Sequence, residues 1–238
     1  MTSQKPAGRA LRVYGLLLAS LALAAARASA NVVDLTFEGL GNDESIDTYY
    51  DGGFGGNGSG PGPNYGITFT SDSLALIAGN APGGGGNFDG ALAPSPDTIA
   101  FFLTGAGDTM DVAAGFTTGF SFFYDNPYYT GSVTVWSGLD GTGTQLLSLT
   151  LNPVAENPNA TYGSYNAWAE MGGAFSGTAE SVIFGGVANQ IGFDNITLGS
   201  SVAVGRAPDS GGFSLVLEAA AAMIAAGFLF RPQARQVV

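Results

Sequence analysis

The chain has 238 residues, a formal net charge of −12 at pH 7, 38 glycines, and neither histidine nor cysteine. The missing residue types exclude histidine-based triads, cysteine nucleophiles, disulfides and ordinary zinc sites. All seven basic residues lie outside residues 31–205, which excludes a lysine Schiff base, an arginine phosphate clamp and a basic nucleic-acid surface there.

The first 30 residues contain the parts of a secretory signal peptide in their usual order. Three basic residues between positions 5 and 12 precede an apolar core at residues 13–25, and residues 28–30 read Ala-Ser-Ala. The apolar core is too short to span a bilayer comfortably. The sequence therefore predicts export with cleavage after Ala30; the alternatives are an uncleaved anchor and a core helix.

Residues 31–200 are predicted to form one all-β domain, a β-sandwich of jelly-roll-like type. No part of the mature segment before Gly211 has a convincing helical period, and short β-rich stretches alternate with turn signals. Residues 133–151 are typical of a hairpin with Asp140-Gly141 in its turn. A domain of this size buries about 70% of its unfolded surface, enough for a core without disulfides. The stretches that indicate strands are VVDLTFEGL, YGITFT, GFSFFYD, SVTVW, LLSLTL, SVIFGG and IGFDNITLG.

Four loop segments lie between these stretches. Residues 51–64 and 79–90 are glycine-rich, which predicts flexible surface loops. Residues 124–131 and 161–168 place aromatic rings in polar surroundings, as sugar-binding sites do when rings stack beside hydrogen-bonding Asn and Asp. The alternative is that the rings cover the sandwich edge as a satellite core. The glycan-binding candidates are Tyr128, Tyr129, Tyr162, Tyr165 and Trp168.

The acidic residues of the domain indicate a bound cation. Residues 31–205 contain 17 of the 19 acidic residues and no basic side chain, so a divalent metal would relieve their repulsion. Glu38 is assigned to the first strand and Asp194 to the last, and such strands are often neighbours in jelly rolls. Two carboxylates that meet without a base need a cation or a shared proton.

The last predicted strand changes phase at Asp194. The apolar positions are odd-numbered before this residue, with Phe193 as an example, and even-numbered after it, beginning with Ile196. A β-bulge would produce this shift and would re-aim the side chains. The alternative is that Asp194 and Asn195 occupy a turn.

The C-terminal residues are predicted to contain a linker at 201–212, an apolar segment at 213–230 and a cytoplasmic basic tail at 231–238. The apolar segment would be about 27 Å long as a helix, just enough to span a bilayer core. Arg231 and Arg235 favour a cytoplasmic end. The alternative is a buried helix of a soluble domain.

These features resemble the PEP-CTERM class of bacterial sorting signals. The stretch PDSGG, beginning with Pro208, Asp209, Ser210 and Gly211, is similar to the VPDSG variant, although Ala207 replaces its valine. The resemblance covers about the last 30 residues. It implies recognition by an exosortase-type membrane protease, with transient membrane anchoring. A GPI signal is the competing interpretation.

The motifs FEGLG and FDNITLG, near the two ends of the domain, resemble those of galactose-binding-like jelly rolls in carbohydrate-binding modules. This resemblance implies a structural calcium ion, with Glu38 and Asp194 as ligand candidates and Asp34 as a weaker one. Asn195 stands where many relatives have a second Asp. The middle of the chain resembles exported β-sandwich domains that precede PEP-CTERM tails.

The combined expectation is a non-enzymatic exported protein at the cell surface or in an extracellular matrix. Its expected partner is an exopolysaccharide, which it would bind or accompany in a biofilm layer. Two other hypotheses remain open: a glycan hydrolase that uses a pair of carboxylates, and a purely structural surface protein.

Overall fold

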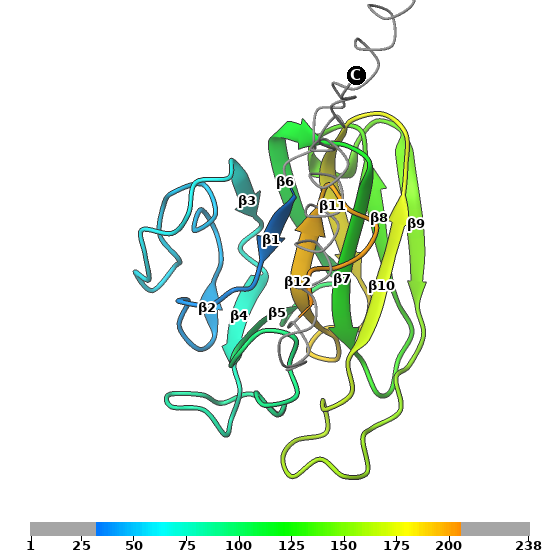
Figure 1. Ribbon diagram of the computed structural model, residues 1–238. Coiled ribbons are helices and arrows are strands. Elements are labelled where there is room, and N and C mark those ends of the chain that lie inside the picture. Colours follow the sequence, from blue (N-terminus) through cyan, green and yellow to red (C-terminus); the bar gives the residue numbers. More distant parts are fainter. Residues whose placement is uncertain (1–31, 206–238) are drawn as a thin grey trace, which may run out of the picture. The chain divides into compact units, whose positions relative to one another are not determined.

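The computed structural model describes residues 32–205, which form two antiparallel β-sheets (Figure 1). In the larger sheet the order is β10–β7–β12–β5–β4–β2, with β1 beside β12, and in the smaller sheet it is β3–β6–β11–β8–β9. The all-β prediction is therefore confirmed. The strands are β1 (Val33–Leu35), β2 (Glu44–Ser45), β3 (Ile67–Phe69), β4 (Ser73–Ile77), β5 (Thr98–Phe102), β6 (Gly107–Phe116), β7 (Gly119–Asp125), β8 (Gly131–Trp136), β9 (Gln145–Leu151), β10 (Ala169–Ala174), β11 (Ala179–Gly185) and β12 (Gly192–Leu198).

Several predicted segments lie outside the described residues. They are the signal peptide at 1–30, the sorting motif at Pro208, Asp209, Ser210 and Gly211, the apolar segment at 213–230 and the basic tail at 231–238. Within residues 32–205, no helix has the length and apolar character needed to cross a membrane.

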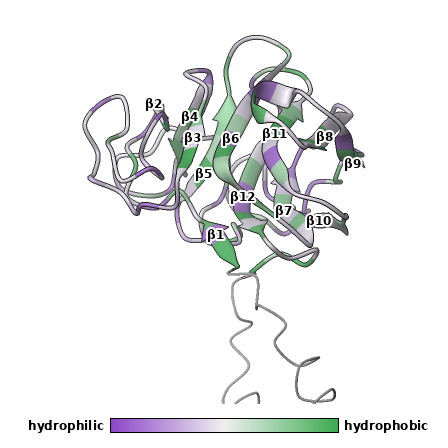
Figure 2. Cartoon of the chain, turned by 90° about the horizontal axis from the view of Figure 1, so that it is seen from above, coloured by the Kyte–Doolittle hydropathy of each residue, from purple (hydrophilic) through white to green (hydrophobic). Residues whose placement is uncertain are grey.

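Aromatic side chains from both sheets meet in the core of the sandwich. The ring of Phe184 on β11 lies 4.9 Å from that of Phe193 on β12 and 6.3 Å from that of Phe122 on β7, measured between centroids. All three side chains are almost completely buried. Figure 2 shows hydrophobic residues concentrated on the strands, with paler and more hydrophilic residues in the loops. Burial of these rings therefore holds the two sheets face to face.

The predicted hairpin is present as β8 and β9. Its connection contains a short 3-10 turn at Leu139–Gly141, with Asp140 at φ 54° and Gly141 at φ 68°. On β8, Val133 and Val135 are buried while their neighbours in the strand are more exposed. The alternation seen in the sequence thus marks the face that contacts the core.

The last strand contains the predicted bulge. Between Asp194 and Thr197 the register of β12 against β7 shifts, and Asn195 adopts φ 46°. β1 and β12 are neighbours, as predicted, with Leu35 opposite Ile196. The assignment of Glu38 to the first strand is wrong, because β1 ends at Leu35 and Glu38 lies in the following turn.

Five strands were not predicted from the sequence, and two of them show why. All five residues of β5 are buried, so this strand lacks the alternation that identifies a half-exposed strand. β10 contains Gly172 and Gly173 and therefore has low β-propensity. At Gly172 a Cβ atom would lie 2.5 Å from the Ser201 carbonyl oxygen, so close backbone packing requires glycine here.

The glycine-rich segment 51–64 is fixed by a buried acid rather than left as a free loop. Glu44 accepts backbone hydrogen bonds from Gly41 (2.6 Å), Asn57 (2.8 Å) and Ser59 (3.0 Å). Burial opposes ionisation of Glu44, but the hydrogen bonds from Ser59, Gly41 and Asn57 outweigh it and lower the pKa. Glu44 thus joins the loop to the edge of the larger sheet.

Candidate functional site

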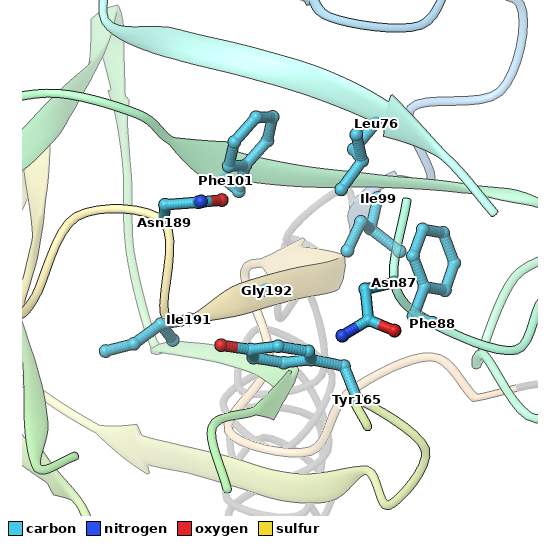
Figure 3. A pocket seen from close by; sticks show the side chains of 9 residues that line it. All are labelled: Leu76, Asn87, Phe88, Ile99, Phe101, Tyr165, Asn189, Ile191 and Gly192. Atoms are coloured by element: carbon cyan, nitrogen blue, oxygen red, sulfur yellow. The ribbon is translucent and has the colours of Figure 1, made fainter. Parts of the chain in front are cut away.

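A small pocket of about 60 Å³ lies on the outer face of the larger sheet (Figure 3). Its floor comes from three adjacent strands, with Leu76 on β4, Ile99 and Phe101 on β5, and Gly192 on β12. On β5 the residues Ala100 and Phe102 face the main core, whereas Ile99 belongs to a second apolar cluster. The floor is therefore the side of the sheet turned away from the sandwich interior. The remaining lining residues are Asn87, Phe88, Tyr165, Asn189 and Ile191.

Two of the loops that line this pocket are joined by hydrogen bonds. The backbone N–H of Tyr165 donates to the Asn87 carbonyl oxygen (3.1 Å), and that of Ser164 donates to Asn87 Oδ1 (3.3 Å). Phe88, which follows Asn87, packs edge-on against Trp168, with ring centroids 6.4 Å apart. These contacts bring the ring of Tyr165 over the floor, as Figure 3 shows.

Gly192 leaves space at the floor of the pocket because it has no side chain. A Cβ atom at this position would lie 2.8 Å from Ile99 Cδ1 and 3.5 Å from Trp168 Cη2. A larger residue would therefore push Ile99 into the pocket or displace Trp168.

Three tyrosines form a cluster beside the pocket. The ring of Tyr128 lies 6.5 Å from that of Tyr129 at 75° and 6.4 Å from that of Tyr165 at 89°, between centroids. Tyr128 is 53% exposed and Tyr129 46% exposed. The Tyr165 hydroxyl donates to Gln190 Oε1 at 3.1 Å, and burial, then the neighbouring Tyr128 and Asp125, raises its pKa to about 12. We refer to Tyr128, Tyr129 and Tyr165 as the tyrosine cluster.

The other two aromatic candidates lie outside this cluster. Trp168 is partly buried in the second apolar cluster, and its Nε1 is buried with no hydrogen-bond partner among residues 32–205. Tyr162 is 39% exposed, and its hydroxyl lies against Gly79. Trp168 therefore belongs to the apolar cluster next to the pocket and not to the tyrosine cluster.

Two acidic residues accompany the tyrosine cluster. Glu156 is exposed, and its Oε1 accepts a hydrogen bond from the Tyr128 hydroxyl at 2.7 Å. Asp125 is 1% exposed; its Oδ2 accepts the Ala167 N–H at 2.9 Å, and its buried Oδ1 has no partner in the described part of the chain. Burial, with a smaller contribution from the charge of Glu156, raises the pKa of Asp125 to about 7.

The predicted calcium ligands lie at a different place on the larger sheet. Asp194 accepts hydrogen bonds from the Ser95 N–H (2.7 Å) and hydroxyl (2.8 Å) and from the Asn195 N–H (2.8 Å). Glu38 accepts the Thr98 N–H at 3.0 Å. Since Ser95 also contacts Glu38, the structure brings Glu38 and Asp194 together around one loop.

The electrostatics of these acids follow from burial. Burial raises the pKa of Asp194 to about 7 against its hydrogen bonds, and the Glu38 charge adds to the increase. Burial also raises the pKa of Glu38 and, to about 6, that of Asp34. Asp34 contacts Asn195 Nδ2 (3.3 Å) and Thr197 Oγ1 (3.4 Å). Among residues 32–205, no three acidic side chains converge in a metal-type cluster.

Sequence reasoning singled out the three residues of the tyrosine cluster but not the other residues around it. Tyr128 and Tyr129 stand out because they follow Asp125-Asn126-Pro127 in a polar loop. The sequence around Glu156 does not indicate a binding residue, because Glu156 joins the tyrosine cluster only through its contact with Tyr128. The floor residues Ile99 and Gly192 belong to strands that are distant in the sequence.

The comparisons with known proteins give partial structural similarities. No protein-family profile and no curated protein matches the chain. Similar solved structures include a carbohydrate-binding module, CBM6cm-2, of Cellvibrio mixtus lichenase 5A with cellotriose (14% identity, 55% of this chain and 88% of the other, TM-score 0.34). Another is CBM35 from Paenibacillus barcinonensis (19% identity, 57% and 94%, TM-score 0.33).

A third similar structure is a glycoside hydrolase family 43 arabinoxylan arabinofuranohydrolase from Bacillus subtilis with cellotetraose (20% identity, TM-score 0.37). The match covers 56% of this chain and 26% of that enzyme. These partial similarities concern the arrangement of strands, so the functional argument rests on the side chains described above.

Proposed function

We propose that the protein binds a carbohydrate at the tyrosine cluster and the adjoining pocket. The observation that supports this most directly is the gathering of Tyr128, Tyr129 and Tyr165 from two loops, with two of the rings about half exposed. Exposed rings offer an apolar platform to the C–H faces of a sugar. Asn87, Asn189 and Glu156 add exposed hydrogen-bonding groups for sugar hydroxyls.

The test is binding of the purified protein to a panel of soluble polysaccharides. Tyr128→Ala and Tyr165→Ala should each weaken binding at least tenfold, because each removes a stacking face worth about 1.4 kcal/mol or more. Tyr65→Ala is the matched control, since Tyr65 is 45% exposed but stacks on Tyr50, outside the tyrosine cluster. Binding that survives both cluster substitutions would contradict the proposed site.

A glycan hydrolase is the second candidate, because Asp125 and Glu156 form a pair of acids beside the rings. The raised pKa of Asp125, about 7, is typical of a general acid. However, Asp125 is 1% exposed and its Oδ2 holds the Ala167 N–H, so it does not reach a ligand at the surface. The geometry therefore favours binding, and release of reducing ends that is lost in Asp125→Asn would reverse this preference.

The proposal includes the cellular setting expected from the sequence. The signal-peptide pattern and the PDSGG stretch with its apolar segment support export and sorting by an exosortase-type protease to the cell surface or matrix. The alternation of strands between the two sheets from β5 to β8 supports a jelly-roll-like topology. Intact-mass measurement on the exported protein tests the processing: a chain that still contains residues 1–30 would contradict it.

A further inference from the structure

We infer that the tyrosine cluster is selective for glycans that contain protonated amines, and that Glu156 determines this selectivity. The inference rests on the proposed carbohydrate binding and names its ligand class. A polymer of amino sugars with free, unacetylated amines is the chemistry that fits.

The first reason is the charge of the site. The exposed Glu156 carboxylate accepts the Tyr128 hydroxyl at 2.7 Å, so it is held against an exposed ring. No basic side chain occurs between residues 32 and 205, so none competes for Glu156 within this part of the chain.

The second reason is the geometry of the rings. Tyr128 meets Tyr129 at 75° and Tyr165 at 89°, so the three rings present faces in different directions. An ammonium group is attracted to aromatic faces by the ring quadrupole and to a carboxylate by charge. A uronate or sulfate ester would instead meet the repulsion of Glu156 with no cation to offset it.

The hydrogen bond from Tyr128 gives Glu156 a fixed position. A free glutamate on an exposed loop would lose side-chain entropy on binding an amine. The Tyr128 hydroxyl reduces that loss by restricting the carboxylate before the ligand arrives. Tyr128 thus contributes both a stacking face and the orientation of Glu156.

The experiment compares oligosaccharides of equal length that differ in one group. Isothermal titration calorimetry at pH 6 and low salt would measure a β-1,4-glucosamine oligomer, its fully N-acetylated form and the corresponding glucose oligomer. We expect the free-amine oligomer to bind about tenfold more tightly than the other two. Glu156→Gln should remove most of this preference, measured as the ratio of the affinities for the free-amine and N-acetylated oligomers.

Two variants separate the site from the overall negative charge. Glu180→Gln changes the charge equally on β11 of the other sheet and should keep the preference. Tyr128→Phe keeps the ring but frees Glu156, so it should reduce the preference only partly.

Three results would overturn the inference. Equal affinity for the three oligomers would refute amine selectivity while leaving carbohydrate binding in place. An amine preference that survives Glu156→Gln would show that Glu156 does not determine the selectivity. Absence of binding to any glycan, here and in the polysaccharide panel, would refute the proposed function as well.

Discussion

At the scale of single residues, the surroundings of each buried acid determine its pKa. Glu44 and Asp194 are both buried acids, but their pKa values shift in opposite directions. Burial raises the pKa of Asp194 to about 7, whereas hydrogen bonds from Ser59, Gly41 and Asn57 lower the pKa of Glu44. Glu44 therefore stays ionised and fixes a loop. The difference arises because desolvation is stronger at Asp194 and the nearby Glu38 charge adds to it, so the hydrogen bonds of Asp194 do not offset this cost as those of Glu44 do.

We propose that Glu38, Asp194 and Asp34 are ligands of a structural calcium ion. Carboxylate oxygens are the ligands calcium prefers. Both oxygens of Glu38 accept hydrogen bonds from Thr98, and both oxygens of Asp194 accept hydrogen bonds from Ser95, so a bound ion would replace some of these donors.

We expect calcium to raise the melting temperature relative to chelator, because an ion that binds only the folded state stabilises it. Glu38→Ala and Asp194→Ala should each abolish the increase, as differential scanning calorimetry would show. Equal melting temperatures with calcium and with chelator would exclude this site.

Among the elements, β12 has the greatest influence on the site. Its first half pairs with β5 and β7, and its second half pairs with β1 and β7. The bulge between Asp194 and Thr197 lets both halves keep apolar side chains toward the core, including Phe193 and Ile196. Gly192, at the start of the same strand, forms part of the pocket floor.

The bulge predicts a ranking of substitutions at Asn195. This residue has φ 46°, and its Nδ2 donates to the Val204 carbonyl oxygen at 2.5 Å. Asn195→Gly and Asn195→Ala both lose this bond, but alanine also pays about 1 kcal/mol for the left-handed backbone. Urea unfolding should therefore find Asn195→Ala less stable than Asn195→Gly by about 1 kcal/mol; the reverse order would contradict the assigned backbone conformation.

At the scale of the whole molecule, the folded domain at residues 32–205 combines many acidic residues with no basic side chain. Burial raises the pKa of Asp108, Asp125 and Asp194 to about 7 each. Residues 32–205 contain no basic side chain that could stabilise the ionised forms. Ionisation of these buried groups therefore opposes folding, and so does the repulsion among the surface acids.

The expected consequence is a protein that gains stability as the pH falls from 8 to 5. In the folded state the pKa values of Asp108 and Asp194 are about 7, above the ordinary value of 3.8. Between pH 3.8 and about pH 7 the folded state therefore binds more protons than the unfolded state, and the free energy of unfolding falls as the pH rises. Each group contributes up to about 1.4 kcal/mol per pH unit in this interval.

Thermal unfolding at pH 5 and pH 8, with chelator present, would measure the effect. Asp108→Asn should reduce the difference in melting temperature, because Asp108 is buried with only the Ser73 hydroxyl as its side-chain partner within the described residues. A melting temperature that is higher at pH 8 would contradict the assigned ionisation.

The sequence by itself determined the properties that depend on local pattern and composition. Alternation identified β8 and β9, the phase change at Asp194 identified the bulge, and composition showed that the domain lacks basic side chains. These inferences succeed because a strand places successive side chains on opposite faces whatever surrounds it.

Only the tertiary structure decided which residues share a site. It separated Trp168 from the tyrosine cluster, joined Glu156 to Tyr128, and placed Glu38 in a turn rather than in β1. These outcomes depend on contacts between loops about 30 to 80 residues apart, and neither spacing nor composition encodes such contacts. The physical reason is that side chains meet where the packing of both sheets leaves room for them, and that packing is a property of the folded chain.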